Sequence, residues 1–121
     1  RWPGVIEPGQ VNGQSVLCAV DLFPSLCAIV GADLPSEYRL DGVDMSATLL
    51  GKEQAVRESP LFWEFGKTKK DRVSPHIAVR EGDWKLLVNA DGSSVELYDM
   101  KNDFNETVNL ATSNPEIAGR L

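Results

Sequence analysis

The segment that decides the fold runs from His76 to Leu87 and reads HIAVREGDWKLL. Apolar and polar residues alternate on both sides of Glu81-Gly82-Asp83, a pattern typical of two antiparallel strands joined by a tight turn. This alternation places residues 76, 78 and 80 on one face and residues 77 and 79 on the other. The segment therefore predicts a hairpin with strands at 77–81 and 84–88.

Two further strands flank this hairpin. Residues 61–65 and 95–99 are short runs of strand-forming residues, and a longer turn over 89–94 contains Gly92. Asn114-Pro115-Glu116 then starts a helix, with proline at its first position and an acid in its first turn. Residues 60–121 are thus expected to form a four-stranded antiparallel sheet packed with a C-terminal helix, an α+β fold.

Residues 1–55 favour helices and turns without a sheet of their own. A short apolar element is expected over 13–20, and Asp21 is expected to N-cap a helix that has Pro24 in its first turn and ends at Gly31. This helix is apolar on most faces, so it is predicted to lie between other elements. A second short helical turn is expected over 45–50, closed by Gly51. Residues 52–59 are interpreted as a polar linker of mixed charge.

Composition limits the possible functions of the chain. Its 121 residues fit a single core, and a net charge of -6 with a pI of about 4.7 argues against a nucleic-acid binder. No apolar run reaches the roughly 20 residues that span a bilayer. Both ends are expected to be cuts in a longer protein. Cys18 and Cys27 are interpreted as buried free thiols, with a disulfide between them as the alternative.

The usual catalytic patterns are absent from the sequence. There is no phosphate-binding glycine loop and no nucleophile elbow, and a single histidine excludes a two-histidine zinc site. Asp99, Asp103 and Glu106 are spaced closely enough to suggest calcium. However, the turn lacks the glycine and glutamate of an EF-hand, so Asp99 and Asp103 are interpreted as caps of turns.

The candidate binding residues are basic or titratable near neutral pH. His76 and Arg80 share one predicted strand face, where they could contact an anion or a sugar, although a histidine hydrogen-bonded to backbone is the simpler interpretation. The loop that follows the first strand holds Lys67, Lys69, Lys70 and Arg72 in an otherwise acidic chain. This loop could bind sulfate or phosphate groups, or it could simply be solvated.

Taken together, these motifs resemble the C-terminal part of type I sulfatases of the alkaline-phosphatase-like superfamily, closest to the arylsulfatase and N-acetylgalactosamine-6-sulfatase group. The resemblance covers nearly the whole chain, and seven pieces stand in register. They are Arg1-Trp-Pro-Gly4, the run from Val20 to Ser25, Asp41 to Asp44 with Leu49 to Gly51, Phe62-Trp63-Glu64, Ala78 to Leu86, Glu96 to Asp99, and Asp103 with Glu106, Asn109 and Leu110.

The resemblance implies that residues 1–55 come from the edge of a larger α/β sulfatase domain and that residues 60–121 form its C-terminal subdomain. Such enzymes hydrolyse sulfate esters with a formylglycine, made from Cys or Ser in C/S-x-P-x-R, and with calcium. Neither Cys18 nor Cys27 stands in that pattern, so no catalytic residue and no metal ligand is assigned to this chain. The fragment alone is expected to be inactive, with formylglycine and calcium in the full-length parent.

The implied role of the chain is to support the fold and the recognition of a sulfated carbohydrate through His76, Arg80 and the basic loop. Its first partner would be the rest of the sulfatase chain, and the isolated fragment is expected to self-associate through residues 15–30 or 45–51. The resemblance implies a periplasmic, extracellular or lysosomal location. Two alternatives stay open: a non-catalytic module that binds a polyanion or a partner, and a degenerate sulfatase relative.

Overall fold

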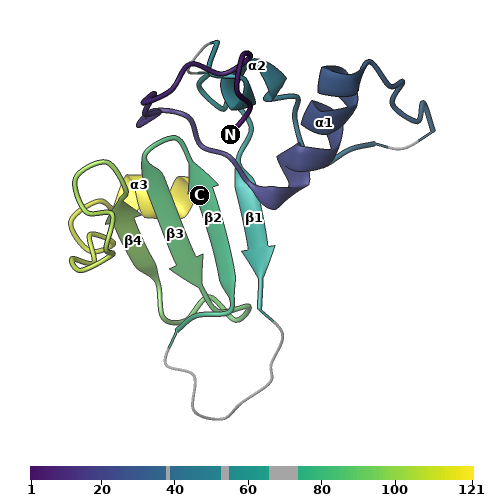
Figure 1. Ribbon diagram of the computed structural model, residues 1–121. Coiled ribbons are helices and arrows are strands. Elements are labelled where there is room, and N and C mark those ends of the chain that lie inside the picture. Colours follow the sequence, from purple (N-terminus) through teal and green to yellow (C-terminus); the bar gives the residue numbers. More distant parts are fainter. Residues whose placement is uncertain (38, 53–54, 66–73) are drawn as a thin grey trace. The chain divides into compact units, whose positions relative to one another are not determined.

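The computed structural model describes residues 1–37, 39–52, 55–65 and 74–121. The chain divides into two compact units, Arg1–Arg57 and Glu58–Leu121. Each unit has its own set of elements and is described separately below (Figure 1).

The C-terminal unit is built on a four-stranded antiparallel meander. Its strands β1 (Leu61–Glu64), β2 (Ile77–Glu81), β3 (Trp84–Val88) and β4 (Glu96–Asp99) lie in sequence order (Figure 1). The two central strands have the predicted bounds, whereas β1 ends one residue earlier and β4 begins one residue later than predicted. Gly82 has φ 57° in the β2–β3 turn, which is the left-handed conformation that glycine adopts without strain.

The two faces of this sheet carry separate apolar clusters, as the alternation predicts. On one face Val79, Leu86 and Leu97 pack with Ile117 and Ala118 of α3 (Pro115–Arg120) and with Leu121. Leu97 has no exposed surface, and full burial of such a side chain is worth about 1.5–3 kcal/mol. The other face carries Trp63, Ala78, Leu87, Tyr98 and Met100. The predicted packing of the sheet with a C-terminal helix is confirmed.

The outer edge of β4 is covered by the segment that returns from the acidic turn. The Leu110 N–H donates to the Leu97 carbonyl at 2.8 Å, and the Asn109 carboxamide accepts from the Leu97 N–H and donates to the Val95 carbonyl, both at 3.1 Å. These bonds satisfy backbone groups that an open edge would offer to another strand. They are a physical reason for an Asn-Leu pair at this position.

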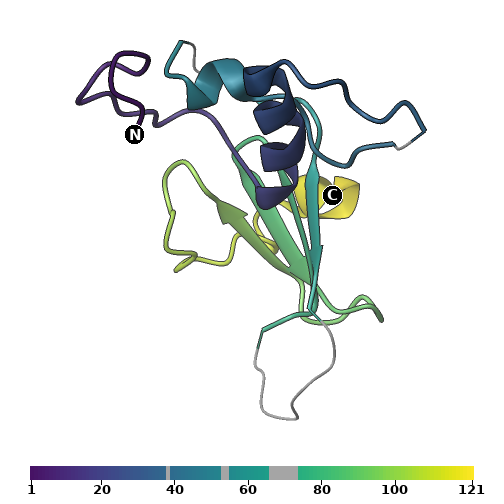
Figure 2. The same ribbon diagram turned by 45° about the vertical axis from the view of Figure 1, so that its right-hand side comes forward.

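The N-terminal unit contains a 3₁₀ turn, η1 (Ala19–Asp21), and two helices, α1 (Leu22–Val30) and α2 (Ser46–Leu49). The helices contact each other (Figure 2). Gly31 closes α1 with φ 69°, as predicted. The short element predicted over 13–20 is wrong for most of its length, since regular structure there begins only with η1.

Helix α1 is exposed along much of its apolar surface. Leu22, Phe23, Leu26 and Val30 are 46%, 51%, 53% and 73% exposed, which agrees with the expectation that residues 15–30 are uncovered in the isolated fragment; self-association through them stays a prediction. One expectation needs correction, since Cys18 and Cys27 are free but half-buried rather than buried. No helix within the described ranges has the length and apolar character needed to cross a membrane.

Candidate functional site

Two of the candidates from the sequence are described by the structure: His76 immediately precedes β2, and Arg80 is its penultimate residue. Both are half-buried. The His76 carbonyl accepts the Phe65 N–H at 2.8 Å, which extends the β1–β2 ladder by one pair. The Arg80 Nε donates to the Gly82 carbonyl at 3.3 Å. Four residues of extended chain separate their Cα atoms by about 13 Å, so the pair suits a ligand longer than a single sulfate ion.

Arg80 belongs to a row of polar side chains across three strands. It pairs with Lys85 on β3, and Lys85 pairs with Tyr98 on β4. The Lys85 Nζ lies 2.6 Å from Glu106 Oε1, with the two side chains 23% and 30% exposed. Two like charges directly opposite each other on a sheet repel. Glu106 reduces this repulsion because it neutralises Lys85.

Arg80 is the cation of this row that keeps binding capacity. Within the described ranges its guanidinium has a backbone carbonyl as partner and no carboxylate. A guanidinium can bind the oxygen atoms of a sulfate or carboxylate with two parallel hydrogen bonds. The row can therefore take one oxyanion at Arg80 without giving up the Lys85–Glu106 pair.

Tyr98 lies at the β4 end of this row and acts as a hydrogen-bond donor. Its Oη donates to Glu96 Oε2 at 3.0 Å. Burial first, and then the neighbouring Glu96 carboxylate, raise the pKa of Tyr98 to about 12. The phenol stays protonated near neutral pH, so it is not a general base there.

The basic loop cannot be placed. Lys67, Lys69, Lys70 and Arg72 all lie outside the described residues. Their predicted role beside His76 and Arg80 stays a prediction.

The acids after β4 act as the turn caps that the sequence predicted. Asp99 accepts from the side-chain amide of Asn102 and from the Lys101 and Asn102 N–H groups, and these bonds, the amide first, hold the pKa of Asp99 below 3.8. Asp103 accepts the Val108 and Thr107 N–H groups at 2.8 Å, which lowers its pKa in the same way. The described part of the chain has no group of three acidic, histidine or cysteine side chains that could hold a metal ion.

The most buried polar group was missed as a site by the sequence analysis. Asp21 has no exposed surface, and its two carboxylate oxygens lie 2.6 and 2.7 Å from Nη1 of Arg57, which is 8% exposed. The carboxylate also accepts the Cys18 N–H at 2.8 Å and the Val43 N–H at 3.0 Å. Burial by itself would raise the pKa of Asp21, but the bonds from Arg57, Val43 and Cys18 outweigh it and hold that pKa below 3.8.

This carboxylate corrects two sequence-based interpretations. Asp21 stands at the N-cap position of α1 as predicted, yet its side chain makes no capping hydrogen bond there and instead joins three segments of the unit. Arg57, which the sequence analysis placed in a polar linker of mixed charge, is buried. Two buried charges need to be paired in this way, because desolvation costs several kcal/mol per ion.

Two neighbours complete this structural centre around Asp21. Ser25 Oγ donates to the Asp21 carbonyl at 2.6 Å and accepts the Met45 N–H at 2.8 Å. Gly42 approaches the backbone so closely that a Cβ atom there would lie 1.9 Å from the Val20 carbonyl oxygen. The Asp41–Asp44 motif is thus held against the N-terminal end of α1. The glycine within the Asp41–Asp44 motif was the available signal, but nothing in the neighbouring sequence identified its partner.

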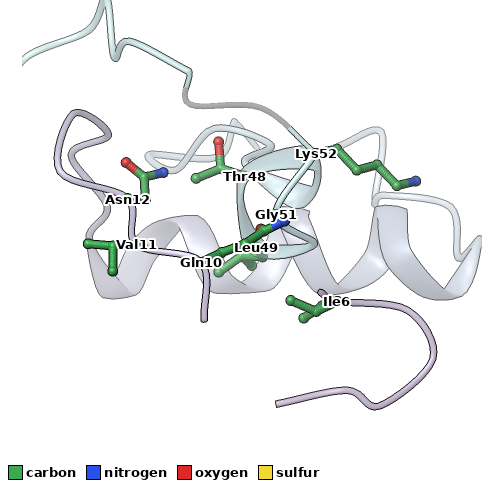
Figure 3. Close-up of a pocket in the computed structure, with 8 residues that line it drawn as sticks. All are labelled: Ile6, Gln10, Val11, Asn12, Thr48, Leu49, Gly51 and Lys52. Carbon is green, nitrogen blue, oxygen red and sulfur yellow. The ribbon is translucent and has the colours of Figure 1, made fainter. Parts of the chain in front are cut away.

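A pocket of about 450 Å³ lies elsewhere in the N-terminal unit. It is lined by Ile6, Gln10, Val11, Asn12, Thr48, Leu49, Gly51 and Lys52 (Figure 3). The Lys52 ammonium points away from Gln10 and Asn12 (Figure 3). Neither His76 nor Arg80 lines this pocket, and Lys52 is the one charged residue among the lining residues that the structure describes.

Comparison with known proteins gives a consistent result over the whole chain. Residues 1–118 match the family described as N-sulphoglucosamine sulphohydrolase, C-terminal. A sulfatase of Formosa agariphila is 36% identical over 124 residues, which cover 95% of this chain and 22% of that protein. An N-acetylgalactosamine-6-O-sulfatase of Bacteroides thetaiotaomicron is 27% identical over 135 residues, covering 100% of this chain and 24% of that protein.

A solved structure agrees with these relatives. The structure of a 2-O GAG sulfatase matches with a TM-score of 0.63 and 30% sequence identity, over 83% of this chain and 22% of that chain. The chain thus spans less than a quarter of the length of each of these three proteins.

Proposed function

The chain belongs to the sulfatase family as its C-terminal domain, and we propose that the full-length protein hydrolyses sulfate esters of carbohydrates while this domain supports the fold and substrate recognition. The observation that carries the proposal is the match to the C-terminal family over residues 1–118. That membership confirms the resemblance read from the motifs. The names of two relatives, an N-acetylgalactosamine-6-O-sulfatase and a 2-O GAG sulfatase, support a sulfated sugar as the substrate class.

Catalysis is proposed to belong to the rest of the protein. Family membership implies a formylglycine nucleophile and calcium, and neither cysteine of this chain has the sequence context for formylglycine. Asp99 and Asp103 do not suggest a calcium site either, because one oxygen of each carboxylate accepts backbone N–H groups and the other accepts a side-chain donor, Asn102 or Thr107. This domain therefore contributes binding groups and packing, and no residue in it is assigned to the chemical step.

The proposed substrate contacts are His76, Arg80 and the loop with Lys67, Lys69, Lys70 and Arg72. The support for Arg80 is its available guanidinium in a row where Lys85 is already neutralised by Glu106. For His76 the support is its position on the same face of β2, about 13 Å along the strand. Four basic residues in one loop of a chain with net charge -6 are a further attraction for a sulfated ligand.

The experiment uses the full-length protein and measures sulfate release from sulfated N-acetylhexosamines. Arg80→Gln is expected to raise KM about 10-fold or more with kcat little changed, since one charge-assisted contact is worth about 1.5–3 kcal/mol. Arg120→Gln is the control, because Arg120 is another arginine of this unit, but it is already ion-paired with Glu81 and is 55% exposed. Equal KM values for the two variants would remove Arg80 from the substrate site.

The same assay separates the proposal from its alternatives. A full-length protein that binds sulfated sugars but releases no sulfate would favour a degenerate relative or a polyanion-binding module. For the compartment, we propose a periplasmic, extracellular or lysosomal location from family membership alone, and fractionation of cells that express the full-length protein tests it.

A further inference from the structure

Glu106 has an unusual backbone conformation for a residue with a side chain. Its φ is 56°, in the left-handed region, and Ser94 is the other non-glycine residue with a positive φ in the described part of the chain. This region is unfavourable for most side chains, whereas glycine and asparagine adopt it readily. Residues stay in such a conformation only where the surrounding structure holds them, and they are frequent at ligand sites.

The acidic turn after β4 holds Glu106 in this conformation. The Glu106 N–H donates to the Asp103 carbonyl at 3.2 Å. The Asp103 carboxylate accepts the Thr107 and Val108 N–H groups, both at 2.8 Å. The peptide groups on both sides of the Glu106 Cα atom are therefore fixed. From this position the Glu106 side chain reaches Lys85 Nζ, 21 residues earlier in the chain, at 2.6 Å.

The Lys85–Glu106 pair changes how many anions this face of the sheet can bind. Arg80 and Lys85 are directly opposite residues of β2 and β3, so their side chains leave the sheet on the same face, with Cβ atoms about 5 Å apart. Two free cations at this separation would suit two neighbouring sulfate groups. Because Lys85 is bound to Glu106, a second sulfate group would have to displace the Glu106 carboxylate or lie beside its negative charge.

We propose that Glu106 determines specificity by limiting this face to one sulfate group of the substrate, which binds at Arg80. The inference rests on the proposed function, because it takes Arg80 to be a substrate contact. Glu106 occupies Lys85 and repels a second sulfate group on the same sugar, so a monosulfated sugar binds better than its disulfated counterpart. Glycine would fit the turn without strain but would leave Lys85 free, which is a physical reason for a glutamate at this unfavourable φ.

The test compares Glu106→Asn with Ser94→Asn in the full-length protein. Asparagine tolerates a left-handed φ at both positions, and Ser94 is an exposed, uncharged residue before β4. The KM for sulfate release is measured on one N-acetylhexosamine that carries either one or two sulfate groups. Glu106→Asn is expected to lower the KM of the disulfated sugar, relative to the monosulfated one, by about 10-fold or more, the effect of one charge-assisted contact. Ser94→Asn is expected to leave this KM ratio unchanged, and an unchanged ratio in Glu106→Asn would overturn the proposal.

A double variant separates the role of Lys85 from damage to the turn. Glu106→Asn combined with Lys85→Gln removes the cation that Glu106→Asn sets free, so the KM ratio is expected to return to that of the parent protein. A ratio that stays shifted in the double variant would overturn the proposal, since Lys85 would then not be the group that binds the second sulfate.

Arg80→Gln distinguishes failure of this inference from failure of the proposed function. If Arg80→Gln raises the KM of the monosulfated sugar while Glu106→Asn leaves the ratio unchanged, the role of Glu106 alone is refuted. If Arg80→Gln leaves the KM of the monosulfated sugar unaltered, the proposed substrate contact and this inference fail together.

Discussion

Removing the arginine of the buried Asp21–Arg57 pair is expected to destabilise the N-terminal unit strongly. Arg57→Met keeps most of the side-chain volume but leaves the Asp21 carboxylate buried with only two N–H donors, from Cys18 and Val43. Loss of one partner from a buried ion pair costs about 3–5 kcal/mol. This is a large fraction of the 5–15 kcal/mol that stabilises a typical domain.

The assay is hydrogen exchange of the Val43 and Met45 amides, because these N–H groups bond to Asp21 and Ser25. A cost of 3–5 kcal/mol corresponds to exchange that is faster by roughly two to four orders of magnitude. Amides of β3 in the other unit report whether the effect is local. Arg120→Met is the matched control, since the Arg120–Glu81 pair is exposed and worth about 0–1 kcal/mol.

The double variant Asp21→Asn with Arg57→Met sharpens the result. It removes both charges, so it is expected to be more stable than Arg57→Met alone. The reasoning would be refuted if Val43 exchange in Arg57→Met stayed within about fivefold of the Arg120→Met control, or if the double variant were less stable than the single one.

Three further predictions follow from the structure. Gly42→Ala places a Cβ 1.9 Å from the Val20 carbonyl oxygen, so thermal unfolding should show loss of the native N-terminal unit. The control Gly13→Ala, whose Cβ meets no atom within 4 Å, should unfold like the parent, and equal midpoints for the two variants would contradict the close approach. Because the pKa of Asp21 is lowered in the folded state, its contribution to stability is present above about pH 3.8 and is lost as the pH falls through the folded pKa. Asp21→Asn should therefore flatten the acid side of a curve of unfolding free energy against pH, and an unchanged slope would count against this. Tyr98→Phe should lower the free energy of unfolding by about 1 kcal/mol and should abolish a phenolate absorbance change near pH 12. The stability that neutral Tyr98 supplies should be lost as the pH rises from 10 to about 12. If this variant left the tyrosine transition near pH 12 unaltered, Tyr98 would titrate at another pH.

The sheet could be predicted from the sequence because its determinants are local. Alternation over residues 77–88 and the glycine at position 82 specify the β2–β3 hairpin without reference to the rest of the chain. Asp99 and Asp103 bond to N–H groups within five residues, so their capping role could also be predicted.

The centre around Asp21 could not be predicted in the same way. Asp21 and Arg57 are 36 residues apart, and no periodicity links them. A carboxylate before an apolar helix looks like an N-cap, and an arginine among polar residues looks solvated. The segments that contain Asp21, Val43 and Arg57 come together only in the folded unit, through the close backbone approach at Gly42 and the hydrogen bonds of Ser25.

The exposure of Leu22, Phe23, Leu26 and Val30 on α1 agrees with the expectation that residues 15–30 are an uncovered apolar surface in the isolated fragment. Apolar spacing shows that a helix buries several faces, but it does not say which part of a protein covers them. In this chain Ser25 holds one side of α1 by hydrogen bonds to the Asp21 carbonyl and the Met45 N–H, and the other side of α1 is exposed.

The central claim is that this chain is the non-catalytic C-terminal domain of a sulfatase, and inorganic sulfate release tests it most directly. Full-length protein and the isolated 121-residue chain are compared on the same sulfated N-acetylhexosamine at equal concentration. The account predicts sulfate release by the full-length protein and none above background by the isolated chain. Release by the isolated chain, or none by an intact full-length protein, would contradict it.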